Sequence, residues 1–230
     1  MESLSSGPAR PFQSKSEYAY EEIKRRILSE ELGPGAVVSQ ERIAAEIGVS
    51  TTPLREALKR LATEGMVNLS SHRDARVVEL TADEARSLYE VRACVDPLAA
   101  SLAAQRRTDG DASRIEAALT TLEPLSGHAS MESLVAHRAF HRAVYRSSHN
   151  EPLIGVLEGL WDKADRYRQV GLRTQADSRS DIERVRTEHK ALAAAVLDQD
   201  ADRAEQVMRD HISGSLGRRA IEALGETSTH

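Results

Sequence analysis

Four histidines are spaced so that their imidazoles could bind one metal ion. His137 and His141 are four residues apart in a segment with helical periodicity, so both side chains project from one helix face. His189 lies as far before Asp200 as His211 lies after it. If two antiparallel helices meet in a turn at Asp200, both rings stand about 16 Å from that turn, at equal height. One shared metal site is therefore possible; the alternative is that each histidine is a separate capped, solvated or hydrogen-bonded polar residue.

A metal held by imidazoles could also activate water, so a metal-dependent hydrolase is the alternative function in the enzyme class. A zinc peptidase helix would carry glutamate directly after its first histidine, but Arg138 stands there. Glu188 precedes His189, yet adjacent helical residues diverge by about 100° and need not share a pocket. The sequence has no Gly-rich phosphate loop and no nucleophile elbow. We therefore expect that the protein is not an enzyme.

A second kind of chemistry is suggested by a short basic segment in the first third of the chain. Between residues 50 and 78, lysine and arginine outnumber aspartate and glutamate. Within this segment Thr52, Arg55 and Lys59 lie together, opposite an apolar helical stripe. A helix that presents such side chains to solvent can read the major groove of DNA. The alternative is an ordinary solvated helix face.

The elements around this basic segment predict how it is held. Periodicity, capping residues and glycines predict three helices, from about Ser16 to Gly33, from Ser39 to Gly48 and from Ser50 to Gly65. Residues 66–80 then hold two short apolar runs around a polar tip, which is typical of a β-hairpin. Three helices followed by such a hairpin form a winged helix-turn-helix, with the third helix for the major groove and the hairpin as the wing.

Composition places the chain among ordinary globular proteins. Its 230 residues are 40% hydrophobic, 29% charged and 3% aromatic, and the mean hydropathy of -0.46 excludes an integral membrane protein. Residues 1–16 have no apolar centre of a signal peptide, so we expect a cytoplasmic protein without a membrane partner. The single cysteine, Cys94, cannot form an internal disulfide. The net charge of -5 argues against indiscriminate coating of nucleic acid but permits a local basic face.

From Thr81 onward the sequence predicts an all-helical bundle. Turn-forming clusters separate six helical segments, which are Ala82–Arg106, Ser113–Leu125, Met131–Ser148, Pro152–Val170, Ser180–Asp198 and Ala201–Arg219. The expected fold class is therefore mainly α, a winged helix-turn-helix followed by a bundle of six or seven helices. The expected domain boundaries are 12–80 and 81–222, with disordered tails at 1–11 and 223–230.

The first half resembles the DNA-binding domain of the GntR family of bacterial transcription regulators. The signature is Val-Ser-x-x-Pro-Leu-Arg-Glu-Ala-Leu, which begins at Val49, followed by Leu-x-x-x-Gly, which ends at Gly65. The resemblance covers roughly residues 16 to 80. It implies contacts with operator DNA from the recognition helix, a residue near the DNA backbone and two residues in the wing. The expected DNA-binding residues are Arg42, Thr51, Thr52, Arg55, Lys59, His72 and Arg73.

Two departures from the family pattern change what can be expected of the operator. The family usually has arginine where this chain has Thr51, and glycine in the wing where it has Asp74. Loss of an arginine removes a candidate reader of guanine, and a carboxylate near phosphates is repulsive. The operator sequence therefore cannot be copied from relatives.

The second half resembles the helical FCD effector domain that accompanies this DNA-binding type, over roughly residues 82 to 216. The resemblance rests on four short sequences and one further histidine, which are Tyr89-Glu-Val-Arg92, Asp96-Pro-Leu-Ala-Ala, Phe140-His141, Glu188-His189 and His211. In that family an aspartate and three histidines bind a divalent metal. This implies that His141, His189 and His211 are ligands here, with His137 at the position of the aspartate.

The exchange of a carboxylate for His137 changes the expected charge of the site. A zinc or nickel ion held by four neutral imidazoles would leave the site near +2 rather than +1, which favours an anionic ligand. Arg92 matches an arginine that the family places near its effector, and it could bind a carboxylate. The alternative for Arg92 is an exposed ion pair with Asp96, one helical turn away. A further alternative is a metal-free anion pocket whose imidazoles titrate with pH.

Together these resemblances imply a ligand-responsive transcription regulator, by default a repressor. It would bind a palindromic operator in double-stranded DNA as a homodimer and respond to a small carboxylate held near a divalent metal ion. A pure dimerisation adaptor would account for the bundle but not for the basic helix.

Overall fold

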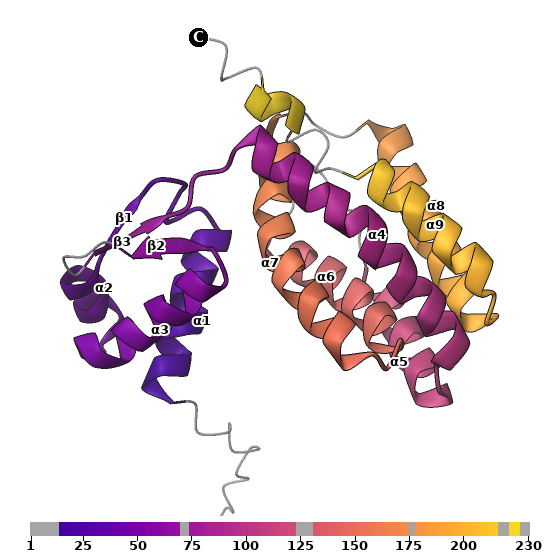
Figure 1. Ribbon diagram of the computed structural model, residues 1–230, viewed down its shortest axis with the longest axis horizontal. Coiled ribbons are helices and arrows are strands. Elements are labelled where there is room, and N and C mark those ends of the chain that lie inside the picture. Colours follow the sequence, from indigo (N-terminus) through magenta and orange to yellow (C-terminus); the bar gives the residue numbers. More distant parts are fainter. Residues whose placement is uncertain (1–13, 70–73, 123–130, 175–177, 216–220, 226–230) are drawn as a thin grey trace, which may run out of the picture. The chain divides into compact units, whose positions relative to one another are not determined.

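The computed structural model describes residues 14–69, 74–122, 131–174, 178–215 and 221–225. The chain divides into two compact units, Met1–Glu79 and Leu80–His230 (Figure 1). The described strands all belong to the first unit, and helices make up most of the second. The predicted fold class, mainly α with a winged helix-turn-helix before a helical bundle, is confirmed.

The first unit combines three helices with a small antiparallel sheet. The elements are α1 (Lys15–Leu28), β1 (Val37–Ser39), α2 (Gln40–Ile47), α3 (Thr51–Thr63), β2 (Val67–Leu69) and β3 (Asp74–Val77). The strand order is β1-β3-β2, with Val38 opposite Ala75 and Asn68 opposite Arg76. The hairpin of β2 and β3 was expected, but β1 was not, because three residues are too short to show an alternating pattern.

The turn between α2 and α3 depends on a glycine. Gly48 has a φ of 70°, and its N–H donates to the carbonyl of Ala44. Residues other than glycine adopt this left-handed conformation at a cost of about 1 kcal/mol or more. The turn lets α3 bury Leu54, Leu58 and Leu61 in the core of the unit. Its opposite side is thereby left facing solvent.

Helix α1 ends earlier than the sequence suggested. It stops at Leu28 rather than near Gly33, and the N–H of Ser29 donates to the carbonyl of Arg25. Leu32 then folds back into the core, with its N–H donating to the carbonyl of Arg26. A buried leucine in the segment after the helix therefore ends it before the glycines do.

The second unit is built around α4 (Ala82–Arg106), which packs against four of the other helices, α6, α7, α8 and α9. The other helices are α5 (Asp109–Thr120), α6 (Met131–Arg146), α7 (Glu151–Thr174), α8 (Arg179–Leu197) and α9 (Ala201–Ser213). Figure 1 shows α8 and α9 as neighbouring helices along one side of α4. None of the described helices is both long and apolar enough to cross a membrane.

Helix boundaries differ from expectation where capping groups decide them. Helix α5 begins at Asp109, not Ser113, because Thr108 and Asp111 form a capping box that turns the Asp-Gly-Asp cluster into the first helical turn. Helix α9 ends at Ser213, with Gly214 as its C-cap. Residues 221–225 are also helical, and thus helix extends into the expected C-terminal tail. Residues 1–11 and 226–230 lie outside the described residues.

Candidate functional site

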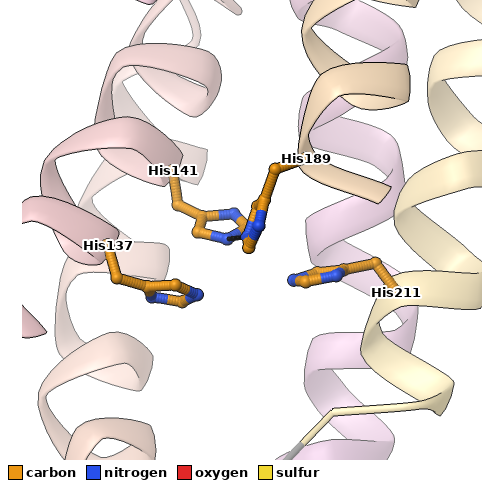
Figure 2. Close-up of side chains that lie close together, drawn as sticks. All are labelled: His137, His141, His189 and His211. Atoms are coloured by element: carbon orange, nitrogen blue, oxygen red, sulfur yellow. Dashed lines mark hydrogen bonds between the residues drawn. The ribbon is translucent and has the colours of Figure 1, made fainter. Parts of the chain in front are cut away.

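The structure brings the four histidines together inside the helical unit. His137 and His141 come from α6, His189 from α8 and His211 from α9, and their rings point toward one another (Figure 2). Their exposed fractions are 4%, 1%, 2% and 7%. They are therefore not solvated surface residues, which was one of the alternatives left open for each of them.

The distances within this histidine cluster suit a shared ion. One ligand nitrogen from each ring lies within 4.8 Å of the others, and Nε2 of His141 is 3.0 Å from Nε2 of His189. Two nitrogens on opposite sides of an ion with bonds of about 2.1 Å stand about 4.2 Å apart. Small side-chain movements would thus bring all four onto one ion. The rings of His189 and His211 are 4.7 Å apart, so the turn at Asp200 does place them side by side.

The surroundings keep these rings in the form that binds metal. Burial, together with the positive charges of Arg168 and of neighbouring histidines, holds the pKa values of His137, His141 and His189 well below the usual value. These three rings are neutral near pH 7, as metal ligation requires. In the described part of the chain, Nδ1 of His137 and Nδ1 of His141 are buried without a hydrogen-bond partner. The donor set and these unpaired nitrogens fit a divalent metal.

One ring of the cluster is oriented from outside. Nδ1 of His211 is 2.9 Å from Oε2 of Glu188, whose other oxygen accepts a hydrogen bond from Arg184. A carboxylate on the far nitrogen of a histidine orients the ring and makes it a better ligand. Glu188 therefore orients His211.

Arg92 lies next to the cluster and is fully buried. Its Nε donates to Oδ2 of Asp96 at 2.8 Å, while Nη1 and Nη2 have no hydrogen-bond partner among the described residues. Its guanidinium carbon lies 4.5 Å from the ring centroid of Trp161, and the ring of His141 lies 4.6 Å from the same ring. The ion pair with Asp96 does form, but the expectation that it is exposed was wrong, since Arg92 is 0% and Asp96 3% exposed.

Burial opposes the charge of Arg92, but the charge persists. Desolvation lowers its pKa, and the interactions with Asp96, Tyr89 and Asp165 together more than offset this effect, so the pKa is raised overall. A charged guanidinium with two unpaired terminal nitrogens in a closed interior is costly unless a ligand pairs with it. We call the buried region formed by the histidine cluster, Arg92 and Trp161 the polar chamber.

Sequence reasoning missed the part of this chamber that α7 supplies. Trp161 is 1% exposed, and four charged residues that follow it in α7 are also buried, which are Asp162, Asp165, Arg166 and Arg168. Arg168 lies with its guanidinium carbon 5.0 Å from the Trp161 ring centroid. A run of charges usually marks a solvated helix face, so no pattern signalled their burial. In the sequence, the only sign that these charged residues are buried was the single tryptophan, Trp161, beside them.

The second candidate site is the exposed side of α2 and α3. Thr52, Arg55 and Lys59 are exposed on α3, Thr51 at its start is half-buried, and Arg42 is exposed on α2. Arg42 pairs with Glu46 at 3.7 Å and Lys59 with Glu56 at 3.1 Å; such surface pairs are weak.

Arg55 makes no ion pair within the described ranges, so its guanidinium is available for a ligand. His72 and Arg73, expected in the wing, lie outside the described residues.

Comparison with known proteins gives matches over both units. Residues 15–77 match the family described as bacterial regulatory proteins, gntR family, and residues 87–214 match the FCD domain. The chain is 28% identical over 198 residues to the HTH-type transcriptional repressor GlaR of Escherichia coli (strain K12), covering 84% of this chain and 90% of that protein. It is 27% identical over 216 residues to the Glc operon transcriptional activator of the same organism, covering 85% of each.

Among solved structures, E. coli McbR/YncC has the same fold. Its TM-score is 0.74 at 21% identity, over 94% of this chain and 99% of that one. These relatives are transcription regulators, and the hydrolase alternative finds no support among them.

Proposed function

The chain belongs to the GntR family of bacterial regulatory proteins, with an FCD domain in its second half, and we propose that it is a repressor controlled by a carboxylate effector. In this proposal a homodimer binds a palindromic operator in the cytoplasm through α3. Binding of the effector in the polar chamber lowers operator affinity. Repression is proposed because the relative GlaR is named a repressor, and dimerisation because a two-fold symmetric protein matches a palindromic site.

One observation carries the effector half of this proposal: Arg92 is fully buried, yet Nη1 and Nη2 lack partners among the described residues. The planar guanidinium presents its N–H groups in a fork that matches a carboxylate. A carboxylate would satisfy both nitrogens at once. Asp96 meanwhile holds Nε and so fixes the direction of the fork.

The histidine cluster adds a second point of attachment for the same ligand. The residues that would hold a divalent ion are His137, His141, His189 and His211, with Glu188 orienting the last of them. When bound, such an ion would supply a Lewis-acid position for a carboxylate oxygen. The guanidinium of Arg92 and the ring of His141 both pack against Trp161, which places the two attachment points near one aromatic ring.

The proposal is tested by measuring operator affinity during titration with small carboxylates. The full chain, loaded with zinc, is bound to a fluorescently labelled fragment of its own promoter, and anisotropy is followed. At least one carboxylate should weaken operator binding by about 5- to 150-fold. Arg92→Gln should bind the operator as tightly as the wild type but lose the response.

Arg86→Gln is the matched control, because Arg86 is an exposed arginine of the same helix that pairs with Asp83. This variant should respond like the wild type. The proposal is contradicted if no carboxylate changes operator affinity, or if Arg92→Gln responds as the wild type does.

A further inference from the structure

The polar chamber contains a second buried guanidinium, that of Arg168. Its guanidinium carbon and that of Arg92 lie 5.0 Å and 4.5 Å from the ring centroid of Trp161. The two guanidiniums are therefore within about 10 Å of each other, on one aromatic ring. Two arginines this close are rarely buried together without anions, because each charge disfavours the other.

Arg168 also acts on the histidine cluster. After burial, its positive charge is among the causes that lower the pKa values of His137, His141 and His189. Arg92 has the same effect on His137. Both guanidiniums are thus close enough to the imidazoles to act on them electrostatically.

The acidic residues nearby are shared among several guanidiniums: Arg138 pairs with Asp162 and Glu158 as well as with Asp165. In the described ranges, Arg168 has one hydrogen-bond partner, Asp165, through Nη1. The other oxygen of Asp165 lies 3.1 Å from Nη1 of Arg138, so one carboxylate serves two guanidiniums. The four imidazoles add no negative charge, and a divalent ion among them would leave about two further positive charges to be neutralised.

We propose that Arg92 and Arg168 bind the two ends of one effector, so that the chamber selects a dicarboxylate over a monocarboxylate. This inference rests on the proposed function and adds the charge class of the effector. One carboxylate of the ligand would accept hydrogen bonds from Nη1 and Nη2 of Arg92. The other would pair with the guanidinium of Arg168, through nitrogens other than the Nη1 that donates to Asp165.

The chain offers a local reporter for the test, because Trp161 is its single tryptophan and lies against both guanidiniums. Tryptophan fluorescence of the zinc-loaded chain is titrated with malonate, succinate and adipate, each compared with the monocarboxylate of equal carbon number. The best dicarboxylate should bind on the order of 10- to 100-fold more tightly than its monocarboxylate.

Arg168→Gln should remove that preference by weakening dicarboxylate binding while leaving monocarboxylates nearly unchanged. Arg168→Lys keeps the charge but not the fork, so it should retain part of the preference; it also serves if the glutamine variant does not fold. Arg138→Gln is the matched control, because it removes the other guanidinium on Asp165 without touching Trp161, and should preserve the preference.

Three results would overturn the inference: equal binding of mono- and dicarboxylates, an unchanged preference in both Arg168 variants, or no fluorescence response to any acid. If carboxylates still release the operator while the preference is absent, the inference fails and the proposed function stands. If no carboxylate releases the operator, the proposed function itself fails.

Discussion

Imidazole binds a metal only in its neutral form, and the helical unit enforces that form by burial. His137, His141 and His189 lie in an interior with two guanidiniums, where a proton on any ring would be both desolvated and repelled. His211 is different, because Glu188 accepts a hydrogen bond from its Nδ1–H and leaves Nε2 for the cluster. At the scale of single residues, the site combines neutral imidazoles, which can bind a cation, with guanidiniums, which can bind an anion.

Removal of one central ring tests the metal part of this account. His141→Ala should lower the metal content below one ion per chain, because it removes one of the four proposed ligands. Elemental analysis of protein purified without chelators measures this directly. His149→Ala is the control, since His149 pairs with Asp111 outside the cluster. This variant should keep the metal content of the wild type. Full metal content in His141→Ala would contradict the proposed ligand set.

Much of the histidine cluster was predictable, but the arginines were only partly so. The spacing of His137 and His141 on one helix face, and of His189 and His211 about Asp200, follows from helix geometry alone. For Arg92 the sequence left an effector ligand and a surface ion pair equally open, because burial depends on neighbours distant in sequence. Arg168 gave no signal for the same reason.

Among the elements, α3 has arginines in two different roles. Arg55 is exposed and makes no ion pair in the described ranges. Arg60 instead anchors the helix to α1: it pairs with Glu17 at 2.9 Å, and its guanidinium carbon lies 3.6 Å from the ring centroid of Tyr20. Substitutions of Arg55 and Arg60 can therefore separate the effect of α3 on DNA binding from its effect on folding stability.

Arg55→Ala should weaken operator binding by about 5- to 150-fold with little change in thermal stability. Arg60→Ala should instead lower the free energy of unfolding by about 1 kcal/mol, through loss of the cation–π contact and ion pairs. Anisotropy with promoter DNA and urea unfolding measure the two effects. If Arg60→Ala impairs operator binding more than Arg55→Ala does, the assignment of α3 as the helix that contacts DNA through Arg55 is refuted.

Sequence patterns predicted the type of most elements and misplaced several of their ends. The helices of both units were expected, because capping residues and apolar periodicity agree over long stretches. The start of α5 at Asp109 was missed because a side-chain capping box outweighs the turn preference of Asp-Gly-Asp. The end of α1 was missed because the burial of Leu32 decides it, and that is a tertiary effect.

At the scale of the whole molecule, regulation requires that the two units exchange free energy. If an effector in the helical unit lowers operator affinity by some factor, operator DNA must lower effector affinity by the same factor. This reciprocity holds whatever structural change carries the coupling. It therefore tests the account without any assumption about how the units are arranged.

The most direct measurement is the affinity of the zinc-loaded chain for its best carboxylate, with and without saturating operator DNA. Tryptophan fluorescence of Trp161 reports binding at the chamber, and operator anisotropy supplies the opposite titration. We predict that operator DNA weakens carboxylate binding by about 5- to 150-fold, equal to the factor by which the carboxylate weakens operator binding. A carboxylate affinity that operator DNA leaves unchanged would contradict the account.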